Sequence, residues 1–328
     1  MSERQPGLVS VIVPVHNRAS LLREAVGSAL GQTYANLEVV IVDDTSTDQT
    51  PAVIAGLVAC APGRVRALRQ AENRGPGPSR ELGRQAARGE FIQYLDSDDL
   101  LLPDKLAKQV EGLRIAEGAA VSYGWTRLRL PDGTPVERPF KRSAERLETI
   151  LPAFLVGRIW NTTTPLYRAS ICDAAGPWTD LRLEEDWEYD CRIGALGAAL
   201  HFVDDWVCEY RSHAPNRLSS GRVLDPLRLR QQARAHVLIC GHARRAGIGS
   251  STSEMAHFAR ALFLIARRCG AAGLGREAKE LLALARSAST PERARGWGFR
   301  VFGGLASVLG WRLAGRFALL VDALRAPR

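Results

Sequence analysis

The N-terminal part of the chain alternates between short apolar runs and amphipathic segments. Residues 8–15 form a continuous, β-branched apolar run, which is typical of a strand covered on both faces. Apolar residues then recur at helical spacing over 20–30, a second apolar run covers 37–42, and a helix over about 49–60 leads to a third strand at 65–68. Because strands and helices alternate at this spacing, we expect a parallel sheet with right-handed crossovers.

Weaker patterns continue through the middle of the chain. A Gly/Pro-rich loop over 71–80 precedes a helix to about residue 88, and the apolar residues 91–95 predict a strand. We further expect a strand over 119–130, a helix near 147–156, a strand over 161–168, a helix starting near Glu184 and an alternating edge strand over 203–211. These patterns predict an α/β protein with a mostly parallel central sheet.

The C-terminal part is helical in pattern. Apolar periodicity predicts helices over 227–246, 253–269 and 275–288. In the last segment, apolar residues spaced by three and four positions form one helical face: Phe302, Leu305, Leu309, Leu313, Phe317, Leu320 and Leu324. This helix either packs within a helical subdomain or lies on an anionic membrane surface, where arginine and aromatic residues are favoured.

The composition is that of an ordinary globular protein, with 46% hydrophobic and 24% charged residues in a chain of 328. The net charge of +9 is unevenly distributed, because residues 221–328 carry 19 basic and only 6 acidic residues. The basicity therefore belongs to the C-terminal region. Aromatic and basic residues are not interleaved as they are in RNA-binding modules, so we expect no nucleic acid partner.

Cysteine usage and the apolar runs bear on location. The six cysteines have no paired spacing, so neither a zinc site nor a disulfide framework is predicted and a reducing compartment is expected. Residues 1–7 contain no apolar signal region. The longest uncharged run late in the chain, 301–311, has 11 residues, against the roughly 20 that span a bilayer. We expect a cytoplasmic protein whose membrane contact, if any, is peripheral, through the last helix on the inner face of the cytoplasmic membrane.

Polar side chains gather where the predicted parallel strands end. His16 and Asn17 follow the first strand, and Asp43 and Asp44 follow the second. In parallel sheets, ligands bind at the carboxyl ends of the strands. These residues and the turn at 96–99 are therefore expected to share one site.

The turn at 96–99 carries three carboxylates within four residues: Asp96, Asp98 and Asp99. Burying so much negative charge is costly unless a cation or hydrogen-bond donors compensate it. Oxygen ligands on alternate positions suit Mg²⁺ or Mn²⁺, which commonly hold a diphosphate. The alternative is an Asp/Ser-rich turn that caps the next helix.

Two loops add candidate residues of lower specificity. Asn73 and Arg80 bound the Gly/Pro-rich loop, where backbone N–H groups and an arginine are available to anions. An ordinary loop with a solvated arginine explains the same residues. His213 follows a strand in a polar loop and is placed to reach a metal or phosphate, although a lone histidine is usually structural or solvated.

A third acidic stretch covers residues 184–190, at the predicted start of a helix. The helix dipole stabilises acids at this position, which is one sufficient explanation for them. The other is that Asp186 acts as a general base in a partly enclosed cleft, with Trp187 as an apolar wall.

Four groups of segments follow one another in a fixed order along the chain. They are 9–18 joined to 40–48, 73–80 with 89–99, 185–188 with Arg192, and 210–213. Together they resemble the family 2 glycosyltransferases with the GT-A fold: an opening strand with a nucleotide-binding turn, a D-x-D metal motif, an acceptor-side E-D segment and the end of the domain. The resemblance marks 1–220 as the transferase domain and leaves 221–328 as a basic helical region.

The resemblance implies a role for each matching residue. The donor-side residues would be Pro14, His16, Asn17, Asp43, Asp44, Asn73, Arg80, Asp96, Ser97, Asp98 and Asp99. Asp43 or Asp44 would accept a hydrogen bond from the donor's base, Asp96 and Asp98 would hold Mg²⁺ or Mn²⁺, and Asp99 would lie near the sugar or ribose. His213 would complete the metal or phosphate environment. On the acceptor side, Asp186 would be the base of an inverting reaction, with Glu185 and Trp187 beside it.

The expected activity is transfer of one sugar from a nucleotide-sugar donor, with UDP-sugars favoured, to a hydroxyl of a glycan or lipid-linked acceptor in cell-surface polysaccharide or glycoconjugate synthesis. The chain lacks the Q-x-x-R-W pattern of processive synthases, which favours single transfer. Thr45 and the stiff Pro76-Gly77-Pro78 segment depart from the family pattern. The alternatives are a nucleotidyltransferase, although 13–18 contains no glycine for a phosphate loop, or a non-catalytic nucleotide-sugar-binding protein.

Overall fold

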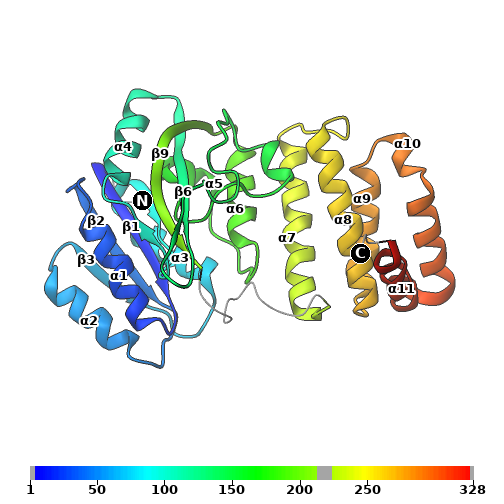
Figure 1. Ribbon diagram of the computed structural model, residues 1–328, viewed down its shortest axis with the longest axis horizontal. Coiled ribbons are helices and arrows are strands. Elements are labelled where there is room, and N and C mark those ends of the chain that lie inside the picture. The colour runs from blue at the N-terminus through cyan, green and yellow to red at the C-terminus, as the bar shows by residue number, and fades with distance from the viewer. Residues whose placement is uncertain (1–3, 213–223, 326–328) are drawn as a thin grey trace. The chain divides into compact units, whose positions relative to one another are not determined.

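The computed structural model describes residues 4–212 and 224–325. Within these residues, nine strands form one mixed sheet in the order β3-β2-β1-β4-β8-β6-β9-β5, with β7 paired to β6. Figure 1 labels β1, β2, β3, β6 and β9 of this sheet. The chain forms two compact units. The sheet unit comprises residues 1–150, 158–182 and 196–217, and the helical unit comprises 151–157, 183–195 and 218–328. Residues 183–195 thus belong to the helical unit, and the domain limit expected at 220 stays a prediction.

The first half of the sheet is parallel, as predicted. Strands β1 (Gln5–Val15), β2 (Leu37–Asp43), β3 (Val65–Arg69) and β4 (Gly89–Tyr94) run in one direction. Helices α1 (Ala19–Leu30), α2 (Thr50–Cys60) and α3 (Pro76–Ala86) connect them. The carboxyl ends of β1, β2 and β4 therefore meet at one edge of the sheet.

The second half of the sheet is mixed. Strand β8 (Leu166–Arg168) is antiparallel to β4 and to β6 (Ala119–Arg129), β6 is parallel to β9 (Ala199–Arg211), and β5 (Leu100–Leu101) is antiparallel to β9. Strand β7 (Pro135–Val136), helix α4 (Lys105–Ile115) and helix α5 (Ala169–Ala175) complete this part. The strand expected at an edge, 203–211, is internal, because the two residues of β5 directly after the acidic turn pair with it.

The middle region is less regular than its sequence pattern predicts. Instead of a helix near 147–156, one 3-10 turn is present, η1 (Ala153–Leu155). The strand expected over 161–168 is reduced to β8. Its first residues form a turn instead, in which the backbone N–H of Thr164 donates to the carbonyl of Asn161 at 3.0 Å.

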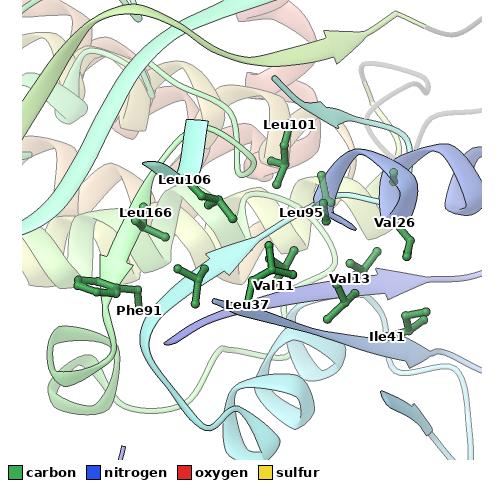
Figure 2. Close-up of a cluster of buried hydrophobic side chains, with 14 of the residues drawn as sticks. Val11, Val13, Val26, Leu37, Ile41, Phe91, Leu95, Leu101, Leu106 and Leu166 are labelled. Carbon is green, nitrogen blue, oxygen red and sulfur yellow. The ribbon is translucent and has the colours of Figure 1, made fainter. Parts of the chain in front are cut away.

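Helices cover both faces of the parallel strands. The main hydrophobic cluster joins β1, β2 and β4 to α1 and α4; Figure 2 shows Val11, Ile41 and Phe91 from the strands with Val26 and Leu106 from the helices. Helix α3 covers the opposite face so closely that a Cβ atom at Gly83 would lie 2.3 Å from Cγ2 of Ile12. Glycine is therefore required at this crossing for the two elements to approach.

The helical unit contains the helices that the C-terminal pattern predicts. Its elements in the described residues are η1, α6 (Glu185–Gly194), α7 (Pro226–Arg245), α8 (Ser253–Ala271), α9 (Gly275–Ser287), α10 (Pro291–Ala294) and α11 (Trp297–Arg325). The side chain of Asp225 caps α7 by accepting from the N–H of Leu227 at 2.9 Å, and Thr252 caps α8 from the N–H of Met255.

Helix α11 is kinked at Gly310, whose φ of 79° is non-helical. The kink divides the single apolar face that the spacing predicts. Before it, Phe302 is buried in the helical unit. Leu309, directly before the kink, and Leu313, Phe317, Leu320 and Leu324 after it are exposed.

The stretch 291–322 is long and apolar enough to cross a membrane by length and composition. The expectation that no such stretch exists was wrong, because it counted only uncharged runs, and a spanning helix tolerates a few charges. A single helix of this kind is weak evidence for a membrane span.

None of the six cysteines, all of which lie in the described residues, forms a disulfide. Cys60, at the end of α2, is exposed, and the others are buried in both units. Burial raises the pKa of the Cys208 thiol to about 11 and that of Cys269 to about 12. Thiol reactivity is therefore concentrated at Cys60.

Candidate functional site

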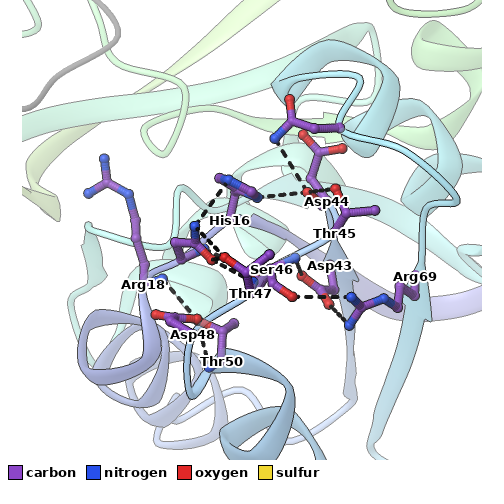
Figure 3. A network of polar contacts seen from close by, with 12 residues as sticks. His16, Arg18, Asp43, Asp44, Thr45, Ser46, Thr47, Asp48, Thr50 and Arg69 are labelled. Carbon is purple, nitrogen blue, oxygen red and sulfur yellow. Dashed lines mark hydrogen bonds and ion pairs between the residues drawn. The ribbon is translucent and has the colours of Figure 1, made fainter.

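Side chains from the ends of β1 and β2 form one hydrogen-bonded network (Figure 3). Asp43 is buried and accepts from the N–H of Ser46 at 2.9 Å and from Nη1 of Arg69 at 2.7 Å. The backbone N–H of Asn17 donates to Oγ of Ser46 at 2.9 Å, and its side-chain oxygen accepts from the N–H of Thr47 at 2.8 Å. The loop after β2 is thereby fixed against the end of β1.

Asp44 joins the same loop to the Gly/Pro-rich loop before α3. Its two oxygens accept from the backbone N–H groups of Arg74 and Gly75, both at 2.8 Å, and from Nε2 of Gln70 at 3.0 Å. Asn73 lies beside it and accepts from Nη1 of Arg182 at 3.0 Å. Asp44 is therefore a clamp between two loops, and its oxygens retain further acceptor capacity because a carboxylate has about four lone-pair directions.

His16 is exposed. Its Nδ1 donates to the carbonyl oxygen of Asp44 at 2.7 Å, because a carbonyl can only accept, and its Nε2 lies 3.3 Å from Nδ2 of Asn17. Pro14 is buried within β1 and pairs with Val42. Thr45 has a φ of 61°, an unfavourable value for a β-branched residue, which explains physically why glycine or asparagine suits this position better.

The acidic turn after β4 is compensated by three arginines. Arg80, nearly fully buried, donates to Oδ1 of Asp96 at 2.7 Å. Nη1 of Arg18 lies 2.8 Å from Oδ2 of Asp98, and Nε of Arg211 donates to the backbone carbonyl of Asp98 at 2.6 Å. Arg80 belongs to α3, Arg18 directly precedes α1, and Arg211 belongs to β9, so three elements contact the turn.

Asp99 is the buried member of the turn. It accepts from Oγ1 of Thr163 at 3.0 Å and from the backbone N–H of Arg211 at 3.2 Å. Burial, with the charges of Asp98 and Asp96, raises the pKa of Asp99 well above its usual value. Ser97 is also buried. Of the turn, only the side chains of Asp96 and Asp98 reach solvent, with 29% and 26% exposed.

The turn has the donor set of a divalent cation site that shares its ion with a substrate. Asp96 and Asp98 offer carboxylate oxygens on alternate positions and remain partly accessible. Among the described residues, no group of three or more His, Cys, Asp or Glu side chains is placed to hold a metal ion. Two carboxylates fit Mg²⁺ when phosphate oxygens and water supply the remaining ligands. His213, the third predicted ligand, lies outside the described residues.

A cavity of about 600 Å³ lies beside the Asp44 clamp within the sheet unit. Gln70 and Arg74 contribute to both the cavity and the clamp. Its other walls come from α3 and from Trp178 and Asp180. The cavity is adjacent to the loop on which the predicted donor residue Asn73 lies.

The acidic stretch at residues 184–190 lies at the start of helix α6 in the helical unit. Asp186 is half-buried in the first turn of α6, and its Oδ1 accepts from the N–H of Trp187 at 2.7 Å. Glu185 is buried. The indole Nε1 of Trp187 donates to the carbonyl of Phe154 at 2.9 Å. Carboxylates in a first helical turn are stabilised by the helix dipole.

The geometry unites the predicted donor residues of β1, β2, α3 and the acidic turn, and it adds three residues to them. Arg18, Arg211 and Thr163 contact the acidic turn but were not predicted as site residues. Arg18 and Arg211 lie inside the motif segments. Because the three carboxylates of the turn require nearby positive charge, these two arginines could have been proposed from the sequence. For Thr163 the sequence holds no such signal.

Comparison with known proteins identifies the family to which the sheet-edge region belongs. Residues 10–168 match the sequence profile "Glycosyl transferase family 2". This region is a family 2 glycosyltransferase domain. The succinoglycan biosynthesis protein ExoO of Rhizobium meliloti (strain 1021) is 38% identical over 152 residues, which are 46% of this chain and 42% of that protein. The chain thus spans less than half the length of the first curated relatives that it matches.

Solved structures share the fold of the family 2 domain. The S. aureus TarS 1-349 fragment in complex with UDP superposes with a TM-score of 0.64 at 19% identity, covering 87% of this chain and 82% of that one. The mannosyltransferase PcManGT from Pyrobaculum calidifontis, in complex with GDP-Man and Mn²⁺, gives a TM-score of 0.53 at 19% identity, covering 96% and 87%. The chain has the GT-A fold with a C-terminal helical region.

Proposed function

We propose that this protein is an inverting, metal-dependent glycosyltransferase that moves one sugar from a nucleotide-sugar donor, UDP-linked by preference, to a hydroxyl of a glycan or lipid-linked acceptor in cell-surface glycan synthesis. One observation carries the proposal. The turn at 96–99 presents two partly exposed carboxylates at the sheet edge where the ends of β1 and β2 are tied together. The TarS and PcManGT structures, which share the fold, hold a nucleotide and a nucleotide sugar.

Each part of the site has a chemical task in this proposal. Asp96 and Asp98 would hold Mg²⁺ or Mn²⁺, which stabilises the charge of a leaving diphosphate when bound. Arg18 and Arg80 already lie at these carboxylates and would add positive charge to the donor's phosphates. Asp43 or Asp44 would accept a hydrogen bond from the base.

Asp186 would take the proton from the acceptor hydroxyl. The acceptor oxygen then forms a bond to the anomeric carbon, the bond from that carbon to the diphosphate breaks, and the nucleoside diphosphate leaves with the electron pair. A single displacement of this kind inverts the anomeric configuration.

Donor binding and turnover test the proposal separately. We would measure binding of UDP-, GDP- and dTDP-sugars by calorimetry with and without Mn²⁺, and then turnover as release of nucleoside diphosphate. Asp98→Ala should abolish metal-dependent binding, whereas Asp186→Asn should keep binding and lose at least about a hundredfold in turnover. Asp132→Asn, in an exposed turn of the sheet unit, is the matched control and should change neither.

The alternatives give different results in this assay or in a second one with a nucleoside triphosphate and a sugar phosphate. Binding without turnover under any condition would favour a non-catalytic nucleotide-sugar-binding protein. Release of pyrophosphate from a nucleoside triphosphate and a sugar phosphate would favour a nucleotidyltransferase. Absence of nucleotide-sugar binding would reject the proposal.

We further propose that the exposed part of α11 rests on an anionic membrane surface on the cytoplasmic side. The four apolar side chains after the kink at Gly310 are between 53% and 78% exposed. Arg312 and Arg316 lie among them on the same helix and are exposed. The region 221–328 has 19 basic against 6 acidic residues, so an anionic lipid surface matches it in charge, at about 1 kcal/mol per basic residue near the surface.

Vesicle flotation tests this contact. The wild type should float with vesicles that contain phosphatidylglycerol but not with pure phosphatidylcholine, and added salt should weaken the binding. A Leu313→Glu, Phe317→Glu variant should not float. Ile115→Glu, which replaces an apolar side chain that is 75% exposed in the sheet unit, should float like the wild type. Resistance to alkaline extraction would indicate a spanning helix, and dimerisation through this face would indicate a second copy; either result would overturn the peripheral assignment.

A further inference from the structure

The residue that precedes the E-D segment has an unusual backbone. Glu184, the N-cap of α6, has a φ of 61° and a ψ of 17°, in the left-handed region. A residue with a side chain adopts this conformation at an energetic cost and keeps it only where its surroundings impose it. This conformation sets the direction in which the chain enters the first turn of α6, and hence the position of Asp186.

The surroundings of Glu184 come from helix α7. Nε2 of Gln232 donates to Oε1 of Glu184 at 3.2 Å, and Nδ1 of His236 lies 3.1 Å from Oε2. Nδ1 of His236 donates to the carbonyl of Gln232 at 2.9 Å. Oε2 of Glu184 has no hydrogen-bond partner among the described residues, so its contact with His236 is a packing contact. Both contacts hold the side chain of Glu184 on α7.

His236 also contacts the other neighbour of Asp186. The indole of Trp187 packs edge-on against the His236 ring at 5.2 Å, and His236 stacks on Phe258 of α8 at 5.4 Å and 8°. His236 is only 4% exposed. The residues on both sides of the E-D pair, Glu184 and Trp187, are therefore held by one buried histidine of α7.

A second contact fixes the next turn of α6. Glu188, 1% exposed, accepts from Nε2 of His242 at 2.6 Å and from Nη2 of Arg192 at 2.9 Å. Burial alone would raise the pKa of Glu188, but these hydrogen bonds outweigh it and lower the pKa below the usual value. Of these two partners Arg192 lies on α6 itself, so the hydrogen bond from His242 is the one that joins Glu188 to α7.

We infer that α7 of the basic C-terminal region positions α6, the helix that carries Asp186, and that His236 and Glu184 are the positioning residues for Asp186. The inference rests on the proposed function, in which Asp186 is the general base. In this reading the C-terminal region serves the reaction through contacts within the helical unit, independently of any membrane contact. Small displacements of a catalytic group have large effects on rate.

Two substitutions of Glu184 separate backbone geometry from side-chain contact. Glu184→Ala loses the contacts to α7 but still disfavours the left-handed backbone, so turnover should fall by about tenfold or more. Glu184→Gly adopts that backbone freely, so it should retain turnover within about threefold of the wild type. Donor affinity, which depends on residues of the sheet unit, should be unchanged in both.

His236→Ala tests the same arrangement from α7. It should lower kcat about tenfold at unchanged donor Kd, with the shape of the pH profile of kcat retained because Asp186 is still the base. Combining it with Glu184→Gly should recover part of the loss. His257→Ala, an exposed histidine on α8, is the matched control, and melting curves of all variants establish that they fold.

The outcomes distinguish this inference from the proposed function. If Asp186→Asn keeps full turnover, the base assignment fails and the positioning inference fails with it. If Asp186→Asn loses turnover while Glu184→Ala and His236→Ala keep it, only the positioning inference is overturned. Equal losses in Glu184→Gly and Glu184→Ala would keep the positioning by α7 but assign it to the side-chain contacts of Glu184 and not to its left-handed backbone.

Discussion

Lys105 provides a test of how strongly burial acts on charge in this protein. It lies in the first turn of α4, has no exposed surface, and donates to the side-chain oxygens of Gln93 and Gln109. Burial lowers the pKa of Lys105 from 10.5 to about 7. The protein therefore loses this proton near neutral pH, while the unfolded chain keeps it until about pH 10.4.

The direction of the stability change follows from proton binding. Above about pH 7 the unfolded chain binds more protons at Lys105 than the folded protein does, so the free energy of unfolding rises with pH, by up to about 1.4 kcal/mol per unit. Below that pH both states are protonated and the full penalty of the buried charge remains. The folded protein begins to lose the Lys105 proton near pH 7. The free energy of unfolding therefore increases by about 2 kcal/mol between about pH 7 and pH 9.

Urea denaturation at these two pH values measures this increase. Lys105→Met should lose the pH-dependent gain, whatever its stability at neutral pH. Lys108→Met, on the exposed side of the same helix, should keep it. If wild type and Lys105→Met gain the same stability between the two pH values, the side chain does not titrate as its burial requires and the reasoning is refuted.

Three further predictions concern packing, acid stability and the acidic turn. Gly83→Ala should lower the free energy of unfolding by about 1–3 kcal/mol, because its Cβ would collide with β1 at 2.3 Å; Gly27→Ala, which meets nothing within 4 Å, should not, and equal urea midpoints would contradict this. The pKa of Glu188 is lowered, so its contribution is present above about pH 4.5 and is lost as pH falls through the folded pKa; Glu188→Gln should thus flatten the acid limb of a thermal-melting profile. Arg80→Met removes the cation 2.7 Å from Asp96, so calorimetry should find tighter Mn²⁺ binding without donor but weaker donor binding.

The parallel part of the fold could be predicted from sequence because its signals are local. Residues 8–15 and 37–42 are apolar on both faces, and each is followed by a helix of matching length. The parallel arrangement then brings the predicted site residues to one edge without further information. The same logic placed Asp43, Asp44 and the acidic turn together.

The parts that were not predicted depend on tertiary contacts. Residues 161–164 have the composition of a strand, yet Oγ1 of Thr163 donates to the buried Asp99. This contact with the acidic turn takes the place of strand pairing in that segment. The segment 203–211 became internal only because two leucines after the acidic turn pair with it. The kink in α11 depends on one glycine, and the spacing of apolar residues carries no trace of it.

The packing of α6 with the C-terminal helices could not be predicted for a related reason. The acidic residues at 184–190 predict where a helix starts, but they do not indicate which other helix packs against it. Gln232, His236 and His242 are far away in sequence, and single polar residues on a helix are not distinctive. Their contacts with the residues around Asp186 become visible only in the folded helical unit.

The distribution of thiols has a consequence for following the motions of the two units. Only Cys60 is open to a reagent in the folded protein, while Cys172 and Cys208 are shielded in the sheet unit and Cys191, Cys240 and Cys269 in the helical unit. Each buried thiol becomes modified only when its own surroundings open, so the labelling rate of each, read by mass spectrometry, reports the local opening free energy there. The natural sequence therefore carries its own set of reporters, which would reveal whether the helices around Asp186 open separately from the nucleotide-binding sheet.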